Sequence, residues 1–310
     1  TMIRSKYCNT GGLTSRQLYE IGECPTWPGG YFIAKGTMCT ITMKQKLRDN
    51  RFLIYPDRKL EAVVGTIISS VSTGTTKLSI FSKPKEGIVM WSNFIKYHNN
   101  KPSPINIFYI LSVLHKFVYG LTSFNRDNFI DIIDDILRYI PEHERNKAMT
   151  HLRQTETMML AAGSNYDLLI ENLLIYCNLS SVHTELDLLA TIRQSLFSQF
   201  NSMVDEGLMT VEEADEYKYY ELCYYIAKYV EYMIGVRSMD DRNSIANCQF
   251  ETPGIALRRL FHDIYKTSVT ELLEEVSTRN PDMSSMRQFV IKVAISVTKQ
   301  FESAITSNTW

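Results

Sequence analysis

Residues 60–81 read LEAVVGTIISSVSTGTTKLSIF, and this stretch decides how the N-terminal part of the chain folds. β-branched side chains fill its first half, and such side chains favour a strand over a helix. They are Val63, Val64, Ile67 and Ile68. Because Ser72-Thr73-Gly74 is a turn signal, we predict a hairpin that runs along Leu60–Val71 and returns through Thr75–Phe81.

The residues before this hairpin carry further strand and turn signals. Residues 1–100 hold 9 of the 14 glycines and four of the nine prolines. Tyr31–Ile33 and Met38–Leu47 are expected strands, and Asp49-Asn50 is an expected two-residue turn before a return strand at Phe52–Tyr55. The sequence therefore predicts a second hairpin over residues 40–55.

The chain changes character near Lys101-Pro102-Ser103-Pro104, where we place a domain boundary. Beyond it the apolar pattern has a helical period almost to the end. Thr210 and Glu213, for example, form a capping box that starts a helix at Val211. The expected fold class is α+β but predominantly α. A small, basic, β-rich domain (1–101) would be followed by a large, acidic helical bundle (102–310).

Length and composition exclude several classes of protein. The 310 residues are 45% hydrophobic and 22% charged, which is ordinary for a globular protein. No apolar run reaches the roughly 18 residues of a membrane span, and no signal peptide is visible, although a leader removed before Thr1 is left open. The six cysteines form no C-x-x-C pair, so we expect a reducing, intracellular setting in the cytoplasm, with no metal and no cofactor.

Charge is unevenly distributed along the chain. Residues 1–120 carry 16 Lys and Arg against 6 Asp and Glu, whereas residues 121–310 carry 17 against 28. This asymmetry indicates either a basic half that binds a polyanion or two halves that attract each other. Two independent solvated surfaces without a partner are the alternative.

The predicted hairpin over residues 40–55 gathers cations on one face. Alternate residues of a strand share a face, so Lys44, Lys46 and Arg48 point to one side. Arg51 stands opposite Arg48 across the turn and joins them, and Tyr55 adds a ring to the same face. Neighbouring cations repel each other unless an anion covers them. Cations next to an aromatic ring are typical of a groove for single-stranded nucleic acid.

Further cations extend this candidate nucleic-acid site. They are Arg58, Lys59, Lys77, Lys83 and Lys85, with a second, weaker group at Arg258 and Arg259. Two alternatives remain for the hairpin. Its lysines would protect an edge strand of a sheet from aggregation, or its cations would bind an acidic protein partner. The alternative for Arg258 is a structural ion pair with Asp263 or Glu251.

Motifs of catalysis are missing from the sequence. It contains no G-x-x-x-x-G-K-[ST], no G-x-G-x-x-G, no H-E-x-x-H and no G-x-S-x-G. The acids Asp131, Asp134 and Asp135 share one expected helix, opposite an apolar stripe, and we interpret them as solvated. We therefore predict no catalytic residues and no enzyme, although an enzyme without a recognisable motif is the third class considered.

The first hypothesis for function is a non-enzymatic structural protein that binds single-stranded RNA and assembles with itself, such as a viral nucleocapsid-type protein. Its basic and acidic lobes would join head to tail, in the cytoplasm or in a virion. The second hypothesis is a helical scaffold or matrix-like protein that binds other proteins and no nucleic acid. Exposed Tyr219, Tyr225 and Tyr232 would favour it, because tyrosine is enriched at interfaces. Burial of these tyrosines in the core is the alternative.

Overall fold

The structure is a computed structural model whose described residues form two compact units. The described residues are 5–27, 29–71, 74–93, 104–121, 125–161, 171, 173–174, 184–279 and 283–307. The smaller unit comprises Thr1–Lys46 and Phe250–Trp310, and the larger unit comprises Leu47–Gln249.

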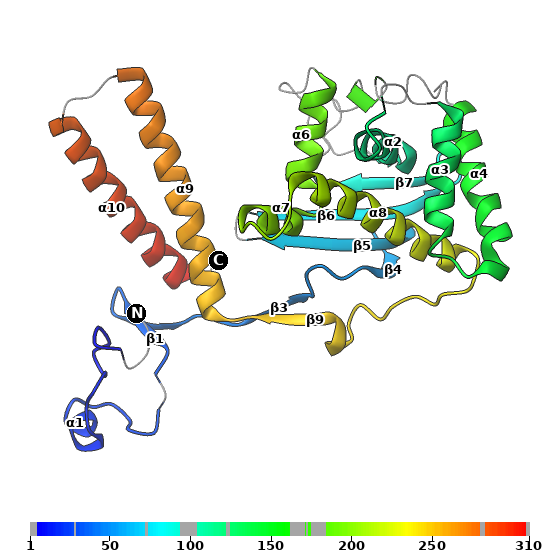
Figure 1. The fold of residues 1–310 in the computed structure, drawn as a ribbon. Helices are drawn as coiled ribbons and strands as arrows, with labels where there is room; N and C mark the ends of the chain where they lie inside the picture. Colours follow the sequence, from blue (N-terminus) through cyan, green and yellow to red (C-terminus); the bar gives the residue numbers. More distant parts are fainter. Residues whose placement is uncertain are drawn as a thin grey trace. The chain divides into compact units, whose positions relative to one another are not determined.

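The larger unit contains a five-stranded antiparallel sheet in the order β4-β5-β6-β7-β8 (Figure 1). Its strands are β4 (Leu53–Asp57), β5 (Ala62–Val71), β6 (Gly74–Lys83), β7 (Gly87–Ser92) and β8 (Ile105–Asn106). The predicted hairpin over residues 60–81 is confirmed, since β5 pairs with β6 with Val64 opposite Phe81. Ser72 and Thr73 of its turn lie outside the described residues.

Helices of the larger unit pack against this sheet. They are α2 (Ile107–Val118), α3 (Arg126–Leu137), α4 (Arg145–Ala161), α6 (Glu185–Ser195), α7 (Ser198–Asp205) and α8 (Val211–Met233), with short 3₁₀ turns η2 (Glu142–Glu144) and η4 (Ile245–Asn247). Helices α2 and α4 contact β7, α7 contacts β5 and α8 contacts β6. The predicted start of α8 is confirmed, because Thr210 and Glu213 form the capping box.

Both faces of the sheet are apolar, and alternate residues of each strand serve different clusters. The main cluster takes Ile54, Ile80 and Met90 together with the helices. A second cluster on the other face takes Leu53, Tyr55, Val64, Phe81 and Val89. Alternation of side chains across a strand explains the division, because odd and even positions point to opposite faces.

The predicted fold class is wrong in its central feature, since the helices do not form a separate bundle. Helical periodicity shows that a helix has an apolar stripe, but it does not show what that stripe covers. Here the stripes cover the main face of the sheet, so helix and strand side chains share one core. The predicted boundary between residues 101 and 102 lies outside the described residues, so the division into 1–101 and 102–310 stays a prediction.

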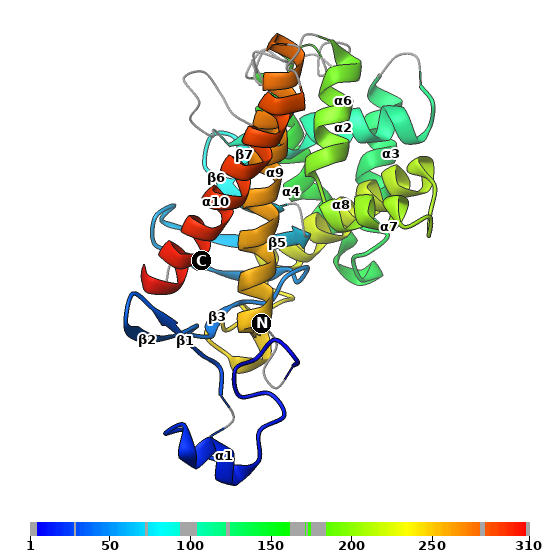
Figure 2. The ribbon, with the colours of Figure 1, turned by 90° about the vertical axis from the view of Figure 1, so that its left-hand side faces the viewer.

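The smaller unit contains a helical hairpin and a short β-hairpin. Its elements are α1 (Ser15–Glu20), β1 (Tyr31–Ala34), β2 (Thr37–Thr40), α9 (Pro253–Arg279) and α10 (Met283–Ser307). Helices α9 and α10 lie side by side in both ribbon views (Figures 1 and 2), where the rings of Phe261 and Phe301 have centroids 6.3 Å apart. Helix α10 also contacts β1 and β2.

Gly87 marks a close approach between β7 and α4. A Cβ atom at this position would lie 2.8 Å from Thr155 Cα, and its φ of +75° is strained for other residues. We expect Gly87→Ala to lower the free energy of unfolding by about 3 kcal/mol, measured by urea unfolding. Gly120 has a φ of +61° but open space around it, so Gly120→Ala is the control, at about 1 kcal/mol. Equal losses of unfolding free energy in the Gly87→Ala and Gly120→Ala variants would contradict a close approach of β7 and α4 at Gly87.

Buried tyrosines of α8 make the larger unit sensitive to alkaline pH. Burial raises the pKa of Tyr219 and Tyr225, and burial raises the pKa of Tyr229 to about 12 although Ser82 N–H donates to its hydroxyl. Folded pKa values above the unfolded value of about 10 mean that this stability is complete below pH 10. It is lost as the pH rises from 10 through 12, by about 2 kcal/mol for Tyr229 alone.

Urea unfolding at a series of pH values from 8 to 12 measures this loss. Tyr229→Phe removes one of the ionisable groups, so the alkaline loss of stability should be smaller in this variant than in the parent. An unchanged alkaline loss would show that Tyr229 does not contribute.

Candidate functional site

The predicted basic hairpin over residues 40–55 does not form. Strand β3 (Lys44–Leu47) pairs with β9 (Cys248–Glu251), and β4 pairs with β5. Leu53, Ile54 and Tyr55 are all buried, because the two faces of β4 enter the two apolar clusters of the sheet. A strand buried on both faces gains more from the sheet than from a two-stranded hairpin.

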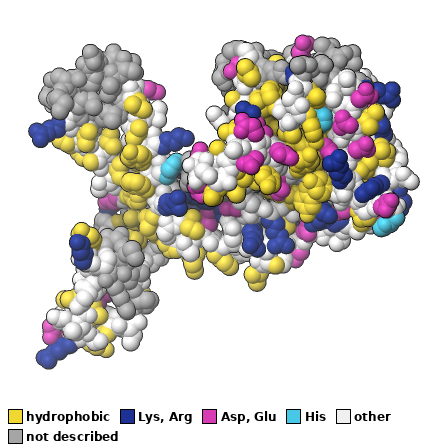
Figure 3. Space-filling view, in the orientation of Figure 1, with side chains coloured by type: hydrophobic (Ala, Val, Ile, Leu, Met, Phe, Trp, Pro, Cys, Tyr) yellow, Lys and Arg dark blue, Asp and Glu magenta, His cyan; other side chains and the backbone are white. Residues whose placement is uncertain are grey.

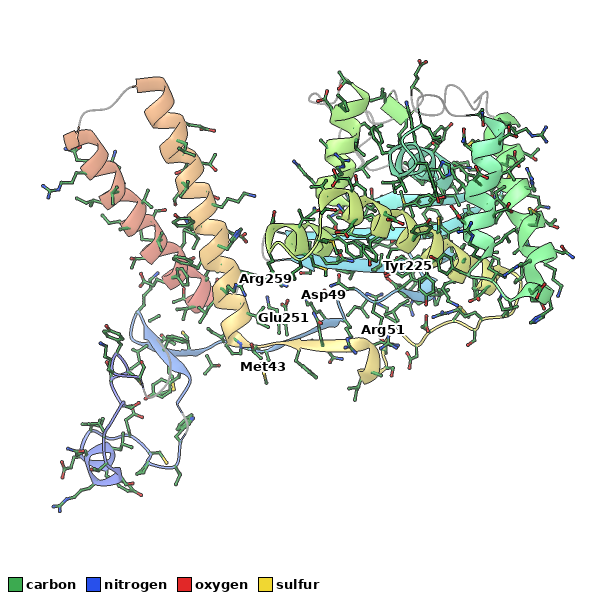
Figure 4. The ribbon with its side chains drawn as sticks, in the orientation of Figure 1. Met43, Asp49, Arg51, Tyr225, Glu251 and Arg259 are labelled. Atoms are coloured by element: carbon green, nitrogen blue, oxygen red, sulfur yellow. The ribbon has the colours of Figure 1, made fainter. Side chains whose placement is uncertain are left out.

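Two of the predicted cations share one carboxylate. Lys46 Nζ lies 2.8 Å from Glu251 Oε1, and Arg259 Nη1 donates to the same oxygen (Figure 4). Partial burial would raise the pKa of Glu251, but the hydrogen bond and charge of Lys46, with Arg259, hold that pKa below its usual value. The ion pair with Glu251 that was considered for Arg258 is therefore made by the next residue, Arg259.

Tyr55 does not present a ring for a base. Its side chain is 2% exposed, and the guanidinium carbon of Arg242 lies 5.0 Å from the ring centroid. Arg242 is far from Tyr55 in the sequence, and no local signal indicated this cation–π contact. The predicted stacking surface is thus absent at Tyr55.

The other predicted site residues lie in different surroundings. Lys83 Nζ lies 2.9 Å from Glu86 Oε1, and Lys77 Nζ lies 5.7 Å from the ring centroid of Trp91. Lys44, Lys85 and Arg258 are exposed. Four of the predicted residues belong to the smaller unit (Lys44, Lys46, Arg258, Arg259) and eight to the larger unit.

Four of the predicted cations lie within twelve residues of one another in the chain of the larger unit. Arg48, Arg51, Arg58 and Lys59 are exposed along a single segment of the chain, and Arg242 is exposed beside it above Tyr55. We call these five residues the basic strip. Figure 3 shows Lys and Arg side chains gathered along the segment between β3 and β4.

A distant segment of the chain holds the basic strip in place. Arg48 N–H donates to the Asn247 carbonyl at 2.9 Å, and Arg51 Nη1 donates to the Ala246 carbonyl at 3.0 Å. Gln249 Nε2 donates to Asp49 Oδ2 at 2.8 Å, next to Arg51 on the same segment (Figure 4). These contacts hold the backbone around Arg48 and Arg51, so the positions of these two cations are set before any ligand arrives.

Carboxylates near the basic strip are engaged in structural roles. Asp240 Oδ2 accepts from Ile54 N–H at 2.8 Å and lies 3.2 Å from Arg237 Nη2. Asp57 Oδ1 accepts from the backbone N–H of Lys59 at 2.8 Å. Among the described residues no ion pair is found for the five side chains of the strip, although the exposed acids Glu61 and Asp241 lie near Lys59 and Arg242 in the chain. Lys46, Lys83 and Arg259, by contrast, are paired with carboxylates.

The described residues contain neither a metal-binding cluster nor a membrane-spanning helix. Within this part of the chain, no three His, Cys, Asp or Glu side chains come together as a group that could hold a metal ion. Among the helices that the structure describes, none has the length and apolarity needed to cross a membrane.

The α8 tyrosines whose exposure would favour the scaffold hypothesis are not exposed. Tyr219 and Tyr225 are buried, and Tyr232 is half-buried. Tyr217 and Tyr224 are exposed instead. Burial in the core, the alternative that the sequence left open, therefore holds for Tyr219 and Tyr225. The sequence pattern alone could not decide this, because apolar residues nearly encircle the helix.

A five-stranded sheet packed against helices, with exposed cations on the segment that leads into β4, defines an α+β module. A family model described as RNA polymerase beta subunit matches residues 1–300. The chain therefore belongs to the RNA polymerase beta-subunit family.

Similar proteins come from plants, fungi and archaea. The chain is 25% identical to DNA-directed RNA polymerase III subunit 2 of Arabidopsis thaliana over 89% of this chain and 21% of that protein. It is 25% identical to subunit RPC2 of Saccharomyces cerevisiae over 86% of this chain and 21% of that protein. It is 24% identical to subunit Rpo2N of Halobacterium salinarum over 100% of this chain and 54% of that protein. The chain thus spans about a fifth of the eukaryotic relatives and about half of the archaeal one.

These comparisons overturn the predicted function. A viral nucleocapsid-type nucleoprotein is wrong, and so is the alternative of a matrix-like scaffold, because the matching family is that of a polymerase subunit. The prediction of a non-enzymatic protein is wrong for the same reason. The predicted partners, single-stranded RNA and further copies of the chain, are also overturned, since the relatives are subunits of DNA-directed RNA polymerases. An intracellular location agrees with these relatives, but a virion is not supported.

Proposed function

We propose that this protein is a β-type subunit of a DNA-directed RNA polymerase and works inside the cell as part of that enzyme. The observation that carries the proposal is the family match over residues 1–300, nearly the whole chain. Relatives named as polymerase subunits in plants, fungi and archaea support it. The catalytic activity belongs to the assembled polymerase, to which the described residues contribute a folded module.

Within this function, the basic strip contacts the phosphates of DNA. Arg48, Arg51, Arg58, Lys59 and Arg242 are exposed on a braced backbone, which suits contacts to a regular row of phosphates. Single-stranded ligands are usually held by stacking of bases on aromatic rings. The ring nearest to the strip, Tyr55, is buried beneath Arg242, so the strip favours backbone contacts over base stacking.

Purification of the protein through an affinity tag at its own locus tests the proposed function. We expect the tagged protein to bring down a complex that incorporates labelled ribonucleotides into RNA on an added DNA template. Removal of the template by DNase should abolish the incorporation, whereas RNase should destroy only the product. A tagged protein that purifies alone, or a complex without template-dependent incorporation, would contradict the proposal.

A further inference from the structure

The solvent face of α8 is unlike its buried face and carries aromatic and acidic side chains. Tyr217, Tyr220 and Tyr224 follow one another at intervals of three and four residues and so lie on the same side of the helix. Tyr217 is 55% exposed and Tyr224 is 38% exposed. Large exposed rings that recur on one side of a helix are more typical of an interface than of a solvated surface.

Rings from neighbouring elements widen this surface. The ring of Phe200 in α7 stacks on Tyr217, with centroids 5.9 Å apart and planes 15° apart. Tyr139 lies edge-on to Tyr224, with centroids 5.5 Å apart, and is 37% exposed. We call Phe200, Tyr217, Tyr220, Tyr224 and Tyr139 the aromatic face. Each ring holds its neighbour in position, so the surface is ordered before a partner binds.

Acidic side chains surround one end of the aromatic face. Residues 198–217 contain six acids and no Lys, Arg or His. Asp215 is buried and paired with Arg193, whose Nη2 lies 2.5 Å from Asp215 Oδ2. The exposed acids are Asp205, Glu206, Glu212, Glu213 and Glu216. Figure 3 shows acidic side chains gathered over α7 and the first turns of α8, next to the apolar surface of that helix.

Cations close to the aromatic face are already engaged. Lys228 Nζ lies 2.8 Å from Glu231 Oε2 and 5.4 Å from the ring centroid of Tyr224. Arg138, next to Tyr139 in the chain, lies 3.1 Å from Asp135 Oδ1. The exposed acids at the start of α8 are therefore not balanced from this side, and the surface has a net negative character.

We infer that the aromatic face is a docking site for a segment of another protein that carries arginine beside apolar residues. Arginine both stacks on tyrosine rings and pairs with carboxylates in a forked geometry. Glu212, Glu216 and Tyr220 follow one another at intervals of four residues and so lie along one side of the helix, where they offer both kinds of contact. Leu208, 66% exposed between α7 and α8, and Val211 offer contacts for the apolar residues of such a segment. Nucleic acid and anionic lipid are disfavoured, because the acids repel phosphate.

Photo-crosslinking in the cell tests this inference. Benzoylphenylalanine replaces Tyr217 or Tyr224 in the tagged protein, and after irradiation the crosslinked peptide is identified by mass spectrometry. We expect both positions to reach the same segment of a different protein and that segment to contain arginine next to apolar residues. Tyr19, 73% exposed on α1, is the control position and should not reach that segment.

Charge reversal supplies the second readout. Glu212→Lys with Glu216→Lys should lower the yield of the adduct about tenfold. Asp127→Lys with Asp131→Lys is the matched control, because these exposed acids occupy the corresponding positions of α3 and give the same change in charge. Urea unfolding of both variants checks that they fold alike. Adducts only to this chain, to a second copy, to nucleic acid or to a segment without arginine would overturn the inference, and so would no adduct at either position.

Discussion

Replacement of Phe108 by alanine is expected to lower the free energy of unfolding by about 3–5 kcal/mol, measured by urea unfolding. Phe108 is fully buried in α2, and its ring centroid lies 4.4 Å from that of Phe129 in α3. Both rings belong to the cluster that also contains Ile80 and Met90 of the sheet. Truncation leaves a cavity at the place where helices and strands share their core.

Phe250 provides the control for this prediction. It is 58% exposed on β9, so Phe250→Ala should change the free energy of unfolding by less than about 1 kcal/mol. Tryptophan fluorescence, to which Trp91 of β7 contributes, and helical circular dichroism should report one shared transition in the Phe108→Ala variant. If the circular dichroism of the helices were lost while the fluorescence still showed a folded sheet, the result would contradict a core shared by helices and sheet.

Removal of the basic strip's charges is expected to weaken DNA binding by the assembled polymerase. Four phosphate contacts contribute about 3.6 to the slope of log affinity against log salt. The variant Arg48→Ala, Arg51→Ala, Arg58→Ala, Lys59→Ala should therefore reduce that slope by about 3–4 and the affinity by roughly 10²- to 10³-fold at ~0.15 M salt. Binding of a fluorescent DNA duplex at several salt concentrations measures both quantities.

Cations that already face a carboxylate give the control for the DNA measurement. Lys83 is paired with Glu86, and Lys147 Nζ lies 2.9 Å from Glu144 Oε2. Lys83→Ala with Lys147→Ala should leave the salt slope nearly unchanged. An equal reduction of the slope in both variants would show that net charge, rather than the position of the strip, governs binding.

Local sequence signals correctly predicted those elements whose formation is determined by residues close to them in the sequence. β-branched residues predicted the β5–β6 hairpin, and the capping box at Thr210 and Glu213 predicted where α8 begins. The same reasoning failed for β3, because its partner β9 lies about 200 residues away. Local turn chemistry at Asp49-Asn50 favoured a neighbouring strand, and no sequence pattern indicated the hydrogen bonds between Asp49 and Gln249.

The sequence correctly showed that cations are concentrated in the first part of the chain. Only the structure showed which of these cations are exposed and which are paired. Glu251 pairs with two of the cations, and Arg242 covers the ring of Tyr55. Only the exposed residues of one segment, with Arg242, remain as the basic strip. The predicted function failed for a different reason: none of the short catalytic motifs considered occurs in the sequence, and the family became evident only from comparison with whole proteins.

Crosslinking of the basic strip to DNA tests the central claim most directly. The tagged protein carries benzoylphenylalanine in place of Arg58, and the polymerase is purified through its tag. This polymerase is then bound to end-labelled duplex DNA and irradiated. We predict a labelled adduct of this protein with DNA at position 58, and none when the crosslinker replaces Lys147. Labelling that is absent at position 58, or equal at both positions, would contradict a DNA-facing strip.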